Sequence, residues 1–203
     1  MIKHKVIELR TFDDCSPELQ SKILEKYRYL ETESGWIVDM VCDYTSDMLD
    51  HEYGFKCTMK DIHYDVSYCQ GSGASFTCDD FDWDKILKDL DIRHKKWWCA
   101  YLDSCGMKIV DSPNCHYCHE MTKHWDTGDC KLDYRGADHD YPYLSKEFDR
   151  ILEYIEDIRI KACNKMYEAV QADYEYYESE EYLSQMFIDN EYLFNEEGEI
   201  DYE

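Results

Sequence analysis

Cysteine and histidine side chains are concentrated between residues 115 and 130, where their spacing could support metal binding. Two cysteines separated by two residues, together with further Cys and His, can form a tetrahedral zinc site. The candidate ligands are Cys115, Cys118, His119 and Cys130. A second C-x-x-C or H-x₃-H pair of the usual spacing is missing, and alternate residues of a strand face opposite ways. We therefore expect ordinary strand residues at 115–119 and no cofactor, with zinc as the alternative.

A glycine-rich loop at 70–73 is the second candidate, because backbone N–H groups in such loops can bind phosphate. Its residues are Gln70, Gly71, Ser72 and Gly73. The lysine and the following helix of a P-loop are both missing, and the loop joins two predicted strands. We expect these glycines to permit a positive φ in a hairpin turn. Binding of a nucleotide or a similar small anion is the alternative.

Acidic residues dominate the chain, since 46 Asp and Glu against 22 Lys and Arg give a formal net charge of −24. Affinity for nucleic acid depends on Lys and Arg neutralising phosphates, so direct nucleic-acid binding is not expected. No Lys or Arg follows Lys165, and residues 166–203 contain 13 acids. Such a surface can imitate nucleic-acid phosphates and dock against a basic groove, or it can simply keep a tyrosine-rich protein soluble. The expected partner-binding residues are Glu168, Glu175, Glu178, Glu180 and Glu181.

Motifs of catalysis and of membrane insertion are missing from the sequence. There is no G-x-S-x-G, H-E-x-x-H or Walker motif, so we expect no enzymatic activity. No segment approaches the roughly 18–20 apolar residues that cross a bilayer, and the N-terminus lacks the apolar region of a secretory signal. The 11 cysteines are an odd number, unlike a secreted disulfide framework. These features predict an intracellular protein with reduced thiols and no membrane partner.

Hydrophobic residues make up 44% of the chain, which is enough for a packed core. Alternating and helical spacings predict one α+β domain over 1–203, with a short, mostly antiparallel sheet packed by helices and an acidic tail at 189–203. The predicted strands are 1–10, a hairpin at 62–68 and 74–78, and two or three short strands within 106–134. The predicted helices are one that begins at Ser16-Pro17, others at about 35–51, 82–90, 93–104 and 179–188, and a long central helix at 145–178.

Three segments resemble the motifs of a family of small phage-encoded proteins, some of them labelled antitoxin-like. The first is Phe-Asp-Asp-Cys-Ser at 12–16, before a predicted helix. The second is Tyr-Cys-Gln-Gly-Ser-Gly-Ala-Ser-Phe at 68–76, which is similar to the family's strand followed by Ser-Gln-Gly-Asp-Gly-Ala-x-Phe. The third combines residues 174–176, 179–181 and 190–194. The resemblance extends over nearly the whole chain and keeps the order of the motifs.

This resemblance implies a phage protein that acts in the host cytoplasm. Phages use small acidic proteins against restriction and CRISPR nucleases, so the family context implies a non-catalytic inhibitor of the anti-restriction or anti-CRISPR type. The expected partner is a host protein with a basic surface. In the second motif Cys69 and Ser72 stand where the family usually has Ser and Asp.

Overall fold

The computed structural model describes residues 8–67, 69–113, 115–128, 130 and 142–201. Helices and short antiparallel strands both occur in these ranges, which confirms the α+β class. The strands form three small sheets, of three, two and two strands. Where the sequence predicted one domain, the chain divides into two compact units. We call them the terminal unit, which is Met1–Val38 with Ala172–Glu203, and the central unit, which is Asp39–Gln171.

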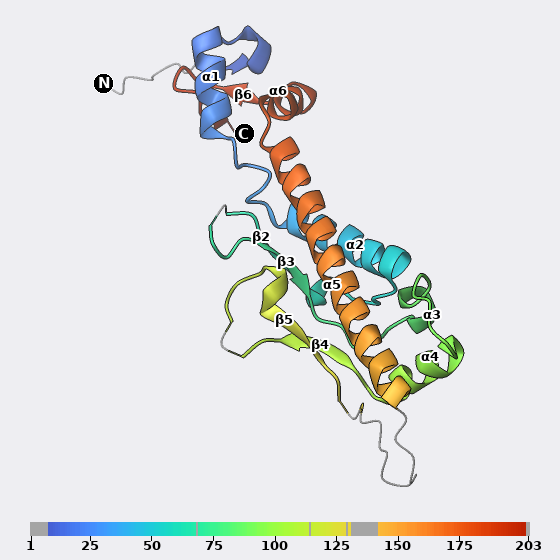
Figure 1. Cartoon of the computed structure of the whole chain (residues 1–203). Coiled ribbons are helices and arrows are strands. Elements are labelled where there is room, and N and C mark those ends of the chain that lie inside the picture. Colours follow the sequence, from blue (N-terminus) through green and yellow to red (C-terminus); the bar gives the residue numbers. More distant parts are fainter. Residues whose placement is uncertain (1–7, 68, 114, 129, 131–141, 202–203) are drawn as a thin grey trace. The chain divides into compact units, whose positions relative to one another are not determined.

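The terminal unit combines both ends of the chain, and Figure 1 shows α1, α6 and β6 within it. Its described elements are β1 (Arg10–Thr11), the 3-10 turn η1 (Phe12–Asp14), α1 (Pro17–Lys26), α6 (Glu180–Asp189), β6 (Leu193–Phe194) and β7 (Ile200–Asp201). The strands form one antiparallel sheet in the order β1-β6-β7. Helix α1 begins where the sequence predicts, because the Ser16 hydroxyl accepts a hydrogen bond from the Leu19 amide at 3.3 Å and Pro17 suits the first turn.

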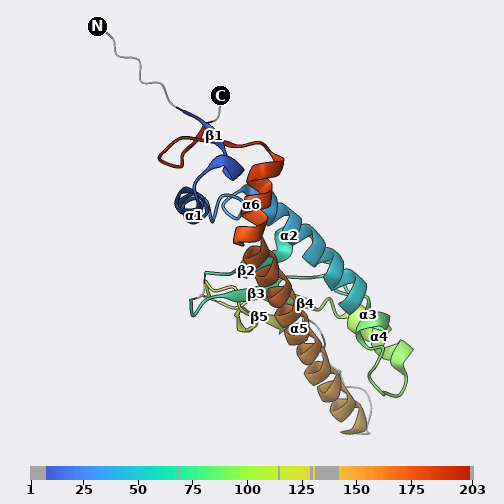
Figure 2. The same ribbon diagram turned by 90° about the horizontal axis from the view of Figure 1, so that it is seen from above.

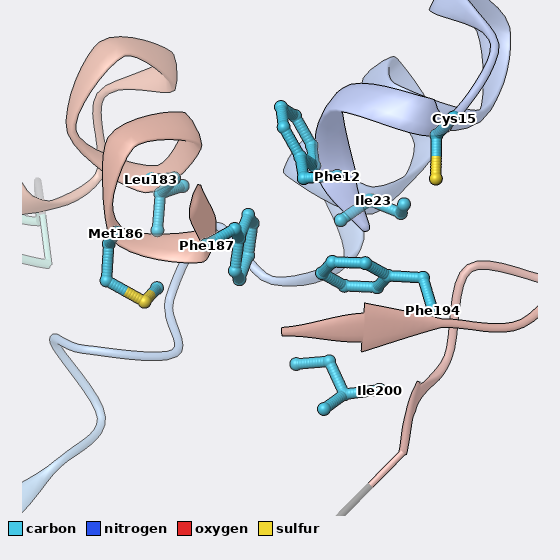
Figure 3. Packing of buried hydrophobic residues seen from close by; sticks show 8 residues of the cluster. All are labelled: Phe12, Cys15, Ile23, Leu183, Met186, Phe187, Phe194 and Ile200. Atoms are coloured by element: carbon cyan, nitrogen blue, oxygen red, sulfur yellow. The ribbon is translucent and has the colours of Figure 1, made fainter. Parts of the chain in front are cut away.

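Apolar side chains from both ends of the chain form the core of the terminal unit (Figure 3). Its members are Phe12, Cys15, Ile23, Leu183, Met186, Phe187, Phe194 and Ile200. The ring centroids of Phe12, Phe187 and Phe194 lie between 5.2 and 6.2 Å apart, in tilted or edge-to-face arrangements that aromatic quadrupoles favour. Burial of these rings holds the N-terminal helix α1 and the C-terminal helix α6 in one unit.

Residues 189–203 do not form the predicted acidic tail in their described part. Phe194 and Ile200 are buried, and the Ile200 amide donates a hydrogen bond to the Tyr27 hydroxyl at 3.0 Å. The prediction of a tail is wrong because two apolar side chains anchor this acidic segment to a core that distant residues supply. Of the predicted strand at 1–10, residues 1–7 lie outside the described residues, and β1 begins at Arg10.

The central unit contains two β-hairpins and most of the longest helix. Its elements are α2 (Gly35–Met48), the π-helical turn η2 (Leu49–Tyr53), the 3-10 turn η3 (Met59–Asp61), β2 (Ile62–Asp65), β3 (Gly73–Phe76), α3 (Trp83–Ile86), α4 (Lys95–Ser104), β4 (Lys108–Asp111), the 3-10 turn η4 (Glu120–Thr122), β5 (Lys123–Asp126) and α5 (Pro142–Tyr177). The first four residues of α2 and the last six of α5 belong to the terminal unit. Figure 1 shows both hairpins on one side of α5 and helices α3 and α4 on the other, and Figure 2 shows α5 from above.

The first hairpin, β2–β3, is the one that the alternating pattern predicts. Its strands are antiparallel, with Ile62 opposite Phe76 and Asp65 opposite Gly73. Ile62 and Phe76 are buried, whereas Tyr64 and Val66 are half-buried. The second hairpin, β4–β5, falls within the predicted strand region at 106–134.

Helix α5 carries the predicted apolar stripe through the central unit. Its buried members there include Ile151, Ile155, Ala162, Met166 and Val170. One charged residue, Arg159, interrupts the stripe and is almost fully buried. Its guanidinium pairs with both oxygens of the Glu156 carboxylate at 2.6 and 2.8 Å and donates to the Glu120 carbonyl oxygen at 2.8 Å. These bonds compensate the desolvation of the charge and tie α5 to η4.

Replacement of Gly73 by valine should destabilise the protein. Gly73 has φ +154°, and a Cβ there would lie 2.6 Å from the His119 Cα atom. Because a backbone atom cannot move aside easily, Gly73→Val should lower the free energy of unfolding in a denaturant titration by more than about 1 kcal/mol. Gly35 has open space at its Cβ position, so Gly35→Ala is the control and should leave stability unchanged or slightly raised. Equal stability of Gly73→Val and the wild type would contradict the expectation.

Candidate functional site

The end of α5 and the start of α6 place four of the five predicted glutamates in the terminal unit. Glu175 is in the last turns of α5, and Glu180 and Glu181 open α6. Ser179 separates the two helices, because its hydroxyl accepts a hydrogen bond from the Tyr182 amide at 3.1 Å and caps α6. Acids in the first turn of a helix interact favourably with its dipole, so the acidic start of α6 is also a stable one.

Glu178 is the fourth of these glutamates and is bound by a residue from the N-terminal part of the unit. The Thr32 hydroxyl donates a hydrogen bond to its Oε1 atom at 3.2 Å. Nearby in the sequence, the Trp36 Nε1–H donates to the Glu31 carboxylate at 3.0 Å. The fifth predicted residue, Glu168, is exposed on the part of α5 that belongs to the central unit.

Aromatic rings lie among these carboxylates. Tyr177 is in edge-to-face contact with Trp36, with centroids 5.4 Å apart, and with Tyr182 at 4.9 Å. Tyr176 lies 5.1 Å from Tyr182 and is 58% exposed. Burial raises the pKa of Tyr182, and the nearby Glu31 carboxylate raises it further. We call this set the acidic junction surface; its members are Glu31, Trp36, Glu175, Tyr176, Tyr177, Glu178, Glu180, Glu181 and Tyr182.

The contribution of residues 31–36 was missed by the sequence reasoning. Glu31 and Trp36 are separated from Tyr177 by about 140 residues of chain, so no local spacing connects them. Only the division of the folded chain into units groups them with the C-terminal acids. The terminal unit contains 19 Asp and Glu against six Lys and Arg, a net charge of −13 in 70 residues.

The glycine-rich loop forms the turn of the β2–β3 hairpin. Its amides are used within the turn: the Ser72 N–H donates to the Cys69 carbonyl at 3.0 Å, and the Cys69 N–H to the Ser72 hydroxyl at 2.9 Å. Gly71 is covered by the Tyr117 ring, which a Cβ at that position would meet at 2.4 Å. Gln70 is exposed. The expected positive φ is found at Gly73, the first residue of β3, but not at Gly71, where close packing against Tyr117 is what requires glycine.

The Cys69 thiol in this turn accepts several hydrogen bonds. The Ser67 hydroxyl donates to its Sγ atom at 3.3 Å, the Gly71 amide at 3.4 Å and the Ser72 hydroxyl at 3.7 Å. These hydrogen bonds, led by that of Ser67, lower the pKa of the exposed thiol because they stabilise the thiolate. A lowered pKa increases the thiolate fraction of Cys69 at neutral pH, and the thiolate is the nucleophilic form.

The predicted zinc ligands are not brought together. Residues 115–119 form a loop instead of the expected strand, and Cys118 is attached to the hairpin through its amide, which donates to the Gly71 carbonyl at 3.2 Å. The strand prediction is wrong because this segment packs over the glycine turn and has no partner strand among the described residues. No three His, Cys, Asp or Glu side chains in the described ranges, including Cys115, His119 and Cys130, are grouped closely enough to hold a metal ion.

The cysteines are all thiols in the structure, with no disulfide among the eleven. Several are core residues, including Cys15, Cys42 and Cys163. Burial raises the pKa of Cys163 to about 12, so this thiol stays protonated and behaves as a small apolar side chain.

Comparison with known proteins adds no family to this description. The chain matches no protein-family model, no curated protein and no solved structure. Among the described helices, none combines the length and the apolar character needed to span a bilayer. Inference about function therefore depends on the surfaces of the chain itself.

The lowered pKa of Cys69 predicts selective alkylation. Burial and the nearby Asp84 carboxylate raise the pKa of Cys99 to about 11. Because the thiolate is the nucleophile, iodoacetamide at pH about 7 should label Cys69 before Cys99. Ser67→Ala removes the main hydrogen bond to the sulfur, so it should slow labelling of Cys69 at neutral pH but not at pH about 10, where both forms ionise. Mass spectrometry of the labelled peptides measures both rates, with Ser104→Ala as the control. An equal rate of Cys69 labelling in Ser67→Ala and the wild type at neutral pH would contradict the expectation.

Proposed function

We propose that this chain is a non-catalytic binding protein that inhibits a basic, nucleic-acid-binding host protein through the acidic junction surface. One observation supports the proposal most strongly. Carboxylates and partly exposed aromatic rings lie together where α5 meets α6, in a segment, 166–203, that contains 13 acids and no Lys or Arg. A partner that binds this surface would therefore contact carboxylates and the aromatic rings that lie between them.

This combination suits association with a cationic groove. A surface rich in carboxylates attracts a basic partner and raises the rate of association, and salt screens this attraction. Tyrosine and tryptophan rings supply contact area at low entropic cost and are enriched among the residues that dominate binding energy. A surface that only maintained solubility would need the charge but not the clustered rings of Trp36, Tyr176 and Tyr182.

The resemblance to small phage-encoded proteins supports the choice of partner. Because phages use small acidic proteins against restriction and CRISPR nucleases, we propose such a nuclease as the target in the host cytoplasm. Occupation of its nucleic-acid groove by carboxylates would be mimicry of phosphates, with no bond made or broken. The chain itself would not bind nucleic acid at this surface, because the net charge of −13 in the terminal unit repels phosphates.

The test is affinity capture from a bacterial host lysate, followed by titration of the captured protein over a salt series. The test variant converts four glutamates to glutamine, which keeps their size and the oxygen that accepts from Thr32: Glu175→Gln, Glu178→Gln, Glu180→Gln and Glu181→Gln. The control variant neutralises four exposed acids of the central unit: Asp43→Asn, Asp47→Asn, Asp103→Asn and Glu153→Gln. We expect the test variant to bind at least about tenfold more weakly, with a shallower salt dependence, and the control to change far less.

Duplex DNA provides the second measurement in this experiment. If the chain occupies the nucleic-acid groove, DNA should displace it from the captured protein in a concentration-dependent way. Identical affinity and salt slope for the two variants, or simultaneous binding of DNA and the chain, would contradict the proposal.

A further inference from the structure

A cavity of about 260 Å³ lies in the central unit, apart from every site considered above. It is open to solvent and is lined by His94, Trp97, Trp98, Tyr143 and Leu144. Four of these five residues carry a ring. The rings come from the start of α4 and the start of α5, so the cavity joins two helices that are about 45 residues apart in sequence.

The wall formed by Trp98 is rigid. Its indole is fully buried, stacks on the Phe148 ring with centroids 5.9 Å apart, and donates a hydrogen bond from Nε1 to the Glu147 carboxylate at 3.3 Å. The other oxygen of that carboxylate accepts from the Arg93 amide at 2.9 Å. Glu147 therefore fixes Trp98 and the chain that leads into α4 at the same time.

The rings of Trp97 and Tyr143 are partly exposed to solvent. Trp97 is 48% exposed although its ring stacks on Tyr101 at 5.3 Å, and Tyr143 is 52% exposed. His94, the N-cap residue of α4, lines the cavity and has φ +56°, a left-handed conformation that is uncommon for residues other than glycine. Exposed rings on a supported scaffold are what a planar ligand needs for stacking.

The segment that leads into α4, and so into this cavity, is basic in an otherwise acidic protein. Residues 85–96 contain five Lys and Arg against two Asp, whereas the whole chain has a net charge of −24. Arg93, Lys96 and Lys146 flank the lining residues in sequence, are exposed, and form no ion pair with any residue that the structure describes. The ligand that fits rings within and cations around is both aromatic and anionic.

We propose that this cavity binds a purine mononucleotide, with its base against Trp97 and Tyr143 and its phosphate near Arg93, Lys96 and Lys146. The size of the cavity, below the usual range of about 300–1,000 Å³ for drug-sized ligands, suits one base with its sugar. A longer polyanion is disfavoured because the acidic remainder of the chain repels additional phosphates. This site is separate from the 70–73 loop and does not depend on the function proposed for the acidic junction surface.

Isothermal titration of the full chain with AMP and GMP tests the proposal, with adenosine, inorganic phosphate and a ten-residue oligo(dA) as comparison ligands. We expect both mononucleotides to bind, and adenosine and phosphate each to bind at least about tenfold more weakly, because each lacks one half of the recognised chemistry. Trp97→Ala should weaken AMP binding at least about tenfold, and Lys96→Gln should weaken it and reduce its salt dependence.

Two control variants match these changes. Trp36→Ala removes an exposed tryptophan of the terminal unit, and Lys60→Gln neutralises an exposed lysine of the central unit; neither should alter AMP binding. Circular dichroism checks that each variant is folded. If Trp97→Ala does not fold, Lys96→Gln still tests the site. Absence of mononucleotide binding up to about 10 mM, unchanged binding in both Trp97→Ala and Lys96→Gln, or tighter binding of the oligonucleotide than of AMP would each overturn the proposal.

Discussion

Repulsion between carboxylates is the constraint under which this chain folds. With 46 Asp and Glu against 22 Lys and Arg, every compact arrangement brings like charges together. The structure keeps its acids at the surface and buries rings and aliphatic side chains beneath them. Among the residues it describes, only Lys123, Glu147 and Arg159 are charged and buried, and each has a partner: Asp111, the Trp98 indole with the Arg93 amide, and Glu156. Removal of one such partner would leave a buried charge uncompensated, which is far more costly than loss of a surface pair.

The charge is also distributed unevenly along the chain. The terminal unit carries −13 in 70 residues, while the central unit carries −11 in 133 and contains the basic stretch 85–96. In the terminal unit, aromatic rings lie among the carboxylates of the acidic junction surface. In the central unit, the rings of the cavity are flanked in sequence by Arg93, Lys96 and Lys146, which form no ion pair with any described residue. The two surfaces therefore suit ligands of opposite charge, a basic protein for the first and an anionic nucleotide for the second.

Local signals in the sequence were sufficient for several elements. Ser16 followed by Pro17 marks the start of α1, the alternation from Ile62 to Val66 marks β2, and the three- and four-residue spacing of apolar residues marks α5. The hairpin β6–β7 could not be predicted, because Phe194 and Ile200 become buried only against a core supplied by residues 12–23. The loop at 115–119 was misread as a strand for the same kind of reason, since its place depends on the glycine turn at 71–73.

In the candidate sites, too, some residues were predictable from the sequence and others are brought together only by folding. The glutamates of the acidic junction surface were predictable from composition, but Glu31 and Trp36 join them through the tertiary structure. The cavity at Trp97 was not predictable, because Tyr143 and Leu144 reach it from another helix and Glu147 fixes its wall. Spacing rules identify ligands that are close in sequence and cannot identify those that only folding brings together.

Hydrogen–deuterium exchange of the full chain, alone and bound to the protein captured from host lysate, tests the central claim most directly. If the acidic junction surface is the interface, exchange should slow in peptides that cover residues 29–36 and 172–190 and stay unchanged at 69–76. Protection confined to the central unit, with 29–36 and 172–190 exchanging as in the unbound chain, would contradict the account.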